Sequence, residues 1–246
     1  MAELYIGTSG YNYPHWKGTF YPGDLPSRQW LSFYSTHFNT VELNVTFYRL
    51  PLAKTFASWY NNTPPGFRFA VKGSRTITHI KRLRDAAEPL AAFFSRAERL
   101  QEKLAVVLWQ LPPGLRGDPE LLADFCMLLQ TNEAARSARH AFEFRHDSWF
   151  SPEVYEILRQ NNFSLCIADS PRWPQSLEVT ADFVYIRFHG SEKVYASCYS
   201  DEELQVWGRR IREWLESGRD VYAYFNNDAG GWAVANARQL LKIILA

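Results

Sequence analysis

Short apolar runs recur along the chain, and longer amphipathic stretches separate each run from the next. The runs are rich in β-branched and aromatic residues, which favour extended backbone with side chains alternating between two faces. They predict eight strands, at residues 4–7, 40–44, 67–72, 104–111, 142–146, 164–169, 183–189 and 220–226. In the fifth run Phe142 and Phe144 would share one face, and Glu143 and Arg145 the other.

The amphipathic stretches carry helical spacing and helix start signals. Ser27 and Asp118 are expected to be N-caps, Pro152 to start a helix, and Ser200 with Glu203 to form a capping box. The predicted helices follow Ser27 through residues 30–38, then 52–60, 89–100, 121–129, from 152 onward, 204–215 and 232–245.

Strands that alternate with helices predict a parallel sheet with right-handed crossovers. Eight such units in 246 residues favour an α/β fold, a single (β/α)8 TIM barrel spanning residues 1–246. Residues 170–182, which include Pro171 and Pro174, leave too little chain for a full crossover helix. The sixth helix is therefore expected to be degenerate or short.

Polar residues lie late in most of these strands, where a barrel builds its active site. The residues expected at this mouth are Glu42, Asn44, Lys72, Gln110, Glu143, Arg145, Asp169, Arg187, His189, Asn226 and Asp228. Charges inside a barrel are a poor route to stability, which favours function over a purely structural network.

Three cations beside three acids suggest a ligand with an anionic part and hydroxyl groups. We therefore expect an enzyme that acts on a small phosphorylated or carboxylated polyhydroxy compound by acid/base chemistry. Glu143 and His189, with Asp169, are the candidate catalytic residues. The glycine-bearing turns at residues 189–191 and 227–231 would lead into helix N-termini that hold phosphate.

Other chemistries have weaker support in the sequence. Glu42, Glu143, Asp169 and His189 could ligate a divalent metal, but Arg145 and Arg187 would repel a cation, so no metal or other cofactor is predicted. A retaining glycosidase would place carboxylates late on strands four and seven, where Gln110 and His189 stand.

Aromatic loop residues are the remaining binding candidates. They either stack on a sugar or base, or cover the barrel core: Tyr11, Tyr13, Trp16, Trp149, Trp173 and Trp232. Tyr11 and Trp149 are placed among the substrate-binding residues. The basic loop 72–84 leaves open a nucleic-acid-binding or phosphodiester-processing protein, and a non-catalytic ligand sensor is the third alternative.

Composition narrows the setting. Lys plus Arg (27) balances Asp plus Glu (26), so no global field points to nucleic acid or membrane. Cys126, Cys166 and Cys198 are widely spaced and odd in number, which indicates a reducing compartment without structural zinc. No signal peptide or spanning run is seen, so a cytoplasmic protein is expected, with its oligomeric state open.

Several motifs resemble the YecE-like family, a DUF72-type domain of unknown function. They are Ile6-Gly7-Thr8-Ser9-Gly10-Tyr11, residues 38–44 with Thr46-Phe47-Tyr48, Phe69-Ala70-Val71-Lys72, Glu143-Phe144-Arg145-His146 with Ser148-Trp149, residues 185–190, and Tyr224-Phe225-Asn226-Asn227. The resemblance covers essentially the whole chain and implies a TIM barrel. It implies no activity, and the likeness to sugar-isomerase and endonuclease IV-type barrels is one of fold alone.

Overall fold

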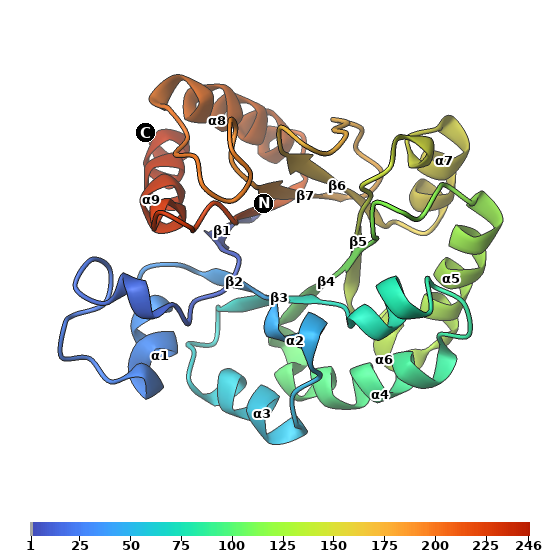
Figure 1. The fold of residues 1–246 in the computed structure, drawn as a ribbon, viewed down its shortest axis with the longest axis horizontal. Helices are drawn as coiled ribbons and strands as arrows, with labels where there is room; N and C mark the ends of the chain where they lie inside the picture. The colour runs from blue at the N-terminus through green and yellow to red at the C-terminus, as the bar shows by residue number, and fades with distance from the viewer. Residues whose placement is uncertain (1) are drawn as a thin grey trace.

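Eight parallel strands form a nearly closed barrel in the computed structural model, which describes residues 2–246 (Figure 1). The order of hydrogen-bonded neighbours is β1-β8-β7-β6-β5-β4-β3-β2. β1 and β2 then meet through the Gly10 amide, which donates to the Glu42 carbonyl at 2.8 Å. The predicted α/β barrel is confirmed.

The strands end close to their predicted positions, with one exception. Their bounds are β1 Leu4–Thr8, β2 Thr40–Leu43, β3 Arg68–Lys72, β4 Leu104–Gln110, β5 Arg139–Glu143, β6 Ser164–Asp169, β7 Phe183–Phe188 and β8 Asp220–Phe225.

The exception is β5, which begins three residues before the predicted 142–146 and ends at Glu143. The true start of β5 was not predicted, because Arg139 and His140 are polar and are not typical strand residues. Both are nevertheless paired in the sheet, opposite Val106 and Val107 of β4. Arg139 is ion-paired with Asp220 at 2.7 Å, and His140 is fully buried and accepts from the Trp109 indole at 3.1 Å. Satisfied polar groups can occupy interior strand positions.

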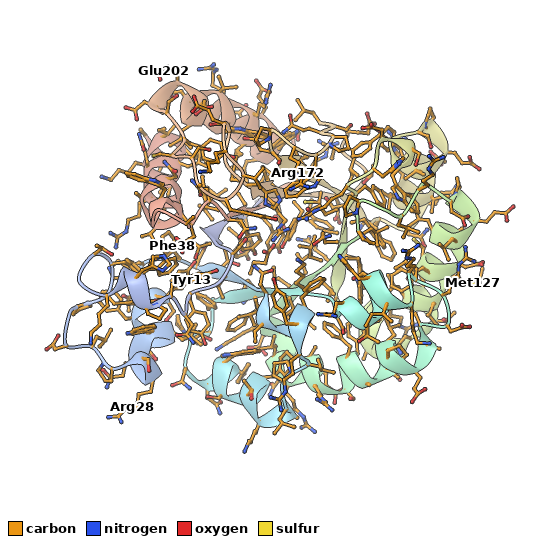
Figure 2. All side chains as sticks on the ribbon, in the orientation of Figure 1. Tyr13, Arg28, Phe38, Met127, Arg172 and Glu202 are labelled. Carbon is orange, nitrogen blue, oxygen red and sulfur yellow. The ribbon has the colours of Figure 1, made fainter. Side chains whose placement is uncertain are left out.

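The helices form a ring outside the strands (Figure 1). Their bounds are α1 Trp30–Tyr34, α2 Val45–Tyr48, α3 Ala53–Asn61, α4 Ala87–Ala97, α5 Pro119–Thr131, α6 Glu133–Arg136, α7 Pro152–Gln160, α8 Asp201–Glu216 and α9 Trp232–Leu245. Shorter turns are η1 Pro14–Trp16, η2 Ser27–Gln29, η3 Thr76–Ile80, η4 Glu98–Lys103 and η5 Asp147–Trp149. Arg28, Met127 and Glu202 project from the outer edge of this ring (Figure 2).

Most of the predicted helix starts are confirmed. The Asp118 carboxylate caps α5 by accepting from the Leu121 amide at 3.0 Å, and the Ser200–Glu203 capping box is formed at α8. The prediction that Ser27 is an N-cap was wrong, because Ser27 is the first residue of η2 and its side chain makes no capping hydrogen bond within residues 2–246. Within residues 2–246 no helix separates β6 from β7, and loops fill the ring between α7 and α8 (Figure 1).

Apolar side chains form two layers. The larger lies between the strands and the helices, and a smaller one fills the N-terminal half of the barrel interior. The interior layer contains Tyr5, Ala70, Val106, Leu108, Ala141, Cys166, Phe183, Tyr185, Tyr222 and Tyr224. Side chains two residues further along several of these strands point the same way, so the C-terminal half of the interior is where the strand-end charges meet.

Candidate functional site

Arg187 of β7 lies at the centre of a charged layer above the apolar interior. Its side chain is 1% exposed and donates to two carboxylates from different strands. Nη2 lies 2.7 Å from Oε1 of Glu42 on β2, and Nη1 lies 2.5 Å from Oε2 of Glu143 on β5. The Tyr185 hydroxyl donates to the other Glu42 oxygen at 2.7 Å, and Nε of Arg145 donates to the other Glu143 oxygen at 2.7 Å.

These contacts fix the charge states of the two acids. Burial raises the pKa of Glu42, but Arg187 and the hydrogen bonds outweigh burial and hold that pKa below its usual value. For Glu143, burial is again the opposing influence, and Arg145 and Arg187 hold the pKa well below the usual range. Both carboxylates therefore remain ionised near neutral pH.

Lys72, the last residue of β3, brings a third cation to this layer. Its side chain is buried, and its Nζ lies 4.1 Å above the centre of the Phe47 ring. Among residues 2–246, Nζ makes no hydrogen bond or ion pair, although the Lys72 carbonyl accepts from the Thr46 hydroxyl at 2.6 Å. Burial first, and then the nearby Arg187, lower the pKa of Lys72 to about 7.

The backbone just after Lys72 is held by close packing. A Cβ on Gly73 would lie 2.4 Å from the Trp109 ring, so only glycine fits at this position. The Gly73 amide also donates to the Leu108 carbonyl at 2.8 Å. Together with the Thr46 hydrogen bond, this contact fixes where the Lys72 side chain leaves the strand.

His189 follows β7 and is fully buried beside the acids. Its Nδ1 lies 3.2 Å from the Asn226 amide, and its Nε2 lies 3.5 Å from Oε1 of Glu143 without hydrogen-bond geometry. Burial lowers the pKa of His189 to about 4 despite the carboxylate, so the ring is neutral at pH 7. Trp173 covers it at 5.1 Å and also stacks on the Arg145 guanidinium at 3.8 Å.

A cavity of about 590 Å³ opens above this layer, at the C-terminal ends of the strands. Its lining combines strand-end charges with loop aromatics and amides: Tyr13, His15, Asn44, Phe47, Tyr48, Lys72, His79, Gln110, Arg145, Arg187, Tyr195, Asn226, Asp228 and Ala229. The volume lies within the range of small-molecule sites.

Most residues expected at the mouth are brought together here. Asn44, Lys72, Gln110, Arg145, Arg187, Asn226 and Asp228 line the cavity. Glu42, Glu143 and His189 form the layer beneath, in contact with Arg187 or Asn226.

Asp169 lies elsewhere, outside the lining of this cavity. Its carboxylate accepts from the Trp207 indole of α8 at 3.0 Å and from Gln175 at 3.4 Å. It borders a separate, smaller cavity beside α8. The last residue of a strand points outward or inward according to register, and Asp169 lies on the face that packs against α8.

Tyr11 and Trp149 are also outside the central cavity. The Tyr11 hydroxyl accepts from the Trp59 indole at 3.0 Å, and its ring borders a neighbouring hollow that shares Tyr13 and Asn44 with the main one. Trp149 is fully buried, stacks on Phe144 at 4.8 Å and donates to the Leu115 carbonyl at 2.8 Å. Trp149 belongs to the core that closes the barrel.

Sequence reasoning missed five residues of the lining: His15, Phe47, Tyr48, His79 and Tyr195. Phe47 and Tyr48 belong to the one-turn helix α2, directly after Asn44, and this turn was not predicted. Their position just past a strand end that carries Glu42 and Asn44 was the available signal. His79 lies in η3, inside the segment that was interpreted only as a basic loop.

The two glycine-bearing turns differ from expectation. After Gly190, whose φ is +102°, the chain continues as a loop up to Ser200, so no helix N-terminus follows that turn. The second turn does lead into α9. There Asp228 accepts from the His15 ring at 2.8 Å and the Trp16 indole at 2.9 Å. A carboxylate therefore already lies at this end of the cavity.

Two further properties of the described residues concern metal ions and membranes. Across residues 2–246, His, Cys, Asp and Glu side chains do not gather in groups of three or more with a metal-binding arrangement. No helix in the same range is both long and apolar enough to cross a bilayer.

Comparison with known proteins places this barrel in a family. Residues 5–245 match the family described as "Protein of unknown function DUF72". The chain belongs to the DUF72 family. It is 30% identical to the UPF0759 protein YunF of Bacillus subtilis (strain 168), over 98% of this chain and 94% of that protein. It is 27% identical to the UPF0759 protein YecE of Escherichia coli (strain K12), over 87% and 83%.

Solved DUF72 structures have the same fold. A crystal structure of a DUF72 family protein from Thermotoga maritima MSB8 superposes with a TM-score of 0.87 at 32% identity, over 99% of this chain and 100% of that one. A DUF72 family protein from Enterococcus faecalis V583 gives 0.84 at 21% identity, over 99% and 96%. The expected YecE-like resemblance is confirmed.

Proposed function

We propose that the cavity binds a small anionic polyhydroxy compound, phosphorylated or carboxylated, and transfers protons on it. The observation that supports this most directly is the excess of cations. Lys72, Arg145 and Arg187 face only two ionised acids, Glu42 and Glu143. The layer therefore carries an excess positive charge whenever Lys72 is protonated, and an anionic ligand would supply the missing counter-charge.

The remaining polar groups suit the other parts of such a ligand. Within the described residues 2–246, Nε of Arg187 is buried without a hydrogen-bond partner, as is Oδ1 of Asn44. Buried groups of this kind are costly unless something binds them, and both residues line the cavity. Gln110 and Asn226 add amides that can donate to or accept from hydroxyl groups.

Roles within the site follow from charge state. Glu143, held ionised by two arginines, is a weak base, and in this proposal it orients Arg145 and Arg187. Lys72 replaces it as the group that gains and loses a proton, because a pKa of about 7 suits acid/base work at neutral pH. His189 stays neutral, and because the Asn226 amide nitrogen donates to Nδ1, its Nε2 carries the ring proton; in this proposal His189 is a hydrogen-bond donor.

Thermal unfolding against matched pairs of ligands tests the proposal. Phosphosugars and sugar acids should stabilise the protein and their neutral parent sugars should not; a ligand at a hundred times its Kd adds about 2.7 kcal/mol. Lys72→Met should abolish the shift, while Lys54→Met, the same change on the exposed face of α3, should keep it. No shift with any anion at millimolar concentration would refute the proposal.

Two alternative functions are distinguished by two other measurements. If the protein binds nucleic acid through the 72–84 loop, affinity should fall steeply with salt, whereas one small anion gives a shallow slope. If it is a ligand sensor, the stabilising compound should be unchanged after long incubation with the protein in deuterated water. Mass spectrometry should then show neither a new product nor deuterium taken up from the solvent.

A further inference from the structure

The amine of Lys72 combines three properties that are seldom found together. It is buried, it faces a cavity of ligand size, and within residues 2–246 it has no carboxylate or carbonyl partner. Lysine amines in proteins are ordinarily exposed, or paired when buried. A buried, partnerless amine beside a cavity has the properties of a lysine nucleophile.

Its surroundings keep the amine accessible as a neutral nucleophile. Phe47 provides an apolar ring beneath Nζ at 4.1 Å, and the nearest acids are already engaged by Arg145 and Arg187. A pKa of about 7 leaves roughly half of the Lys72 side chains neutral at pH 7, against about a thousandth or less of an ordinary exposed lysine.

We propose that Lys72 forms an imine with the carbonyl carbon of the anionic compound bound in this cavity. The substrate class is thereby narrowed to a 2-oxo acid or a phosphorylated aldehyde or ketone, held through its anionic group by Arg145 and Arg187. This inference rests on the proposed anion binding and adds a covalent step to it.

The step is balanced without an oxidant or reductant. The Nζ lone pair attacks the carbonyl carbon while the C=O π electrons move to oxygen, which takes up a proton and becomes a hydroxyl. The nitrogen loses one proton in forming this hydroxyl-bearing adduct and a second in forming the imine. The hydroxyl takes up one further proton and leaves as water, and C=N replaces C=O. Amine plus carbonyl thus gives imine plus water.

His79 is placed to accept the protons released by Lys72. It lines the same cavity, and its ring contacts Phe47 at 4.8 Å, the ring that also lies beneath Nζ. Burial, and then the charge of Lys72, lower the pKa of His79 to about 4, so the imidazole is a neutral base at pH 7. The Thr78 hydroxyl donates to the Ser74 carbonyl and lies 2.9 Å from Nδ1. That oxygen can therefore accept from Nδ1–H, which leaves Nε2 as the basic nitrogen.

Reductive trapping tests the inference. The protein is incubated at pH 7 with pyruvate, dihydroxyacetone phosphate or glyceraldehyde 3-phosphate and sodium cyanoborohydride, and the modified lysine is located by peptide mass mapping. With at least one probe, Lys72 should carry one reduced adduct at least about tenfold above the exposed Lys54, because far more of its amine is neutral. Labelling of Lys72 at or below the level of Lys54 with all three probes would overturn the inference.

Lys72→Arg separates this inference from the proposed function. Arginine keeps a cation at the site but forms no stable imine under these conditions, so the adduct should vanish while anionic ligands still raise the melting temperature. Lys54→Met should keep both the adduct and the shift. If anionic ligands raise the melting temperature of the native protein but Lys72 is never trapped, anion binding is supported and imine formation is refuted. If neither is seen, both fail.

Discussion

Two buried lysines lie at opposite ends of the barrel and have opposite surroundings. Lys103, just before β4, is 3% exposed, and its Nζ donates to the Tyr60 carbonyl at 2.6 Å, the Thr63 carbonyl at 2.7 Å and the Thr63 hydroxyl at 3.1 Å. Lys72, the last residue of β3, is 8% exposed, and within residues 2–246 its Nζ lies over the Phe47 ring and makes no hydrogen bond.

The difference separates an amine whose protons the fold satisfies from one whose protons it does not. All three ammonium protons of Lys103 are satisfied by oxygens fixed in the α3–β3 connection, so the charge holds that connection to β4. Lys72 gains nothing comparable from the fold, and its burial costs stability. The N-terminal end of the barrel therefore uses its lysine for folding, while the mouth holds a lysine whose amine the residues 2–246 leave without a hydrogen-bond partner, as the proposed ligand site requires.

The largest effect is expected from removing Arg187, whose guanidinium pairs with the carboxylates of Glu42 and Glu143 that lie near Lys72. Arg187→Met leaves Glu42 and Glu143 buried without their shared guanidinium, which should lower the free energy of unfolding by about 3–5 kcal/mol. Glu143 would keep Arg145, whereas the freed Glu42 carboxylate should then pair with Lys72 and make it resemble Lys103. Urea unfolding measures the loss.

The control is Arg84→Met. Arg84 pairs with Asp118 at the protein surface, where 66% of the Arg84 side chain and 39% of the Asp118 side chain are exposed. It should cost about 1 kcal/mol or less. Equal losses in the two variants would mean that the buried layer contributes no more than a surface pair.

A smaller effect is expected from exchanging each lysine for methionine. Lys103→Met leaves the Tyr60 and Thr63 carbonyls without a donor and should lower the free energy of unfolding by about 2–3 kcal/mol. Lys72→Met removes an uncompensated buried charge and should leave stability unchanged or raised. Chemical denaturation of the pair decides, and a larger loss for Lys72→Met would reverse the comparison.

The smallest effect is a pH dependence specific to Lys72. Its pKa is about 7 in the folded protein against 10.5 for the free side chain, so between these values the unfolded chain binds a proton that the folded one lacks. Stability from this group therefore rises with pH above 7 and is constant below it. Relative to Lys72→Met, the native protein should gain about 1 kcal/mol in free energy of unfolding between pH 7 and pH 8. A flat difference would show an ordinary, ionised lysine.

The spacing of apolar residues predicted the barrel, because the side chains of a strand alternate between two faces. This alternation is present in the strand's own sequence, whatever the strand pairs with. The prediction failed at β5, where Arg139 and His140 occupy strand positions that only distant partners, Asp220 and Trp109, make tolerable. Local sequence carries no signal of such long-range compensation.

The site was predictable to the extent that strand ends converge. Lys72, Arg145 and Arg187 were placed correctly at the cavity because parallel strands end at one rim. Asp169 was misplaced because the face that a terminal residue adopts depends on register, and here Trp207 holds it outside. Which lysine lacks a partner could not be read from the sequence, since it depends on which acids Arg187 already engages.

The double engagement of Arg187 also shapes how chains of this kind can diverge. Glu42, Glu143 and Arg187 are linked by ion pairs, so replacing any one alone removes a partner from at least one buried charge. Inherited variation at these three positions must come in coordinated sets, which single-nucleotide changes seldom supply. Tyr13, Tyr48 and Tyr195 line the same cavity from loops and short turns and take no part in this network. If the cavity binds a ligand as proposed, its preference can therefore change at these tyrosines one substitution at a time while the charged layer stays the same.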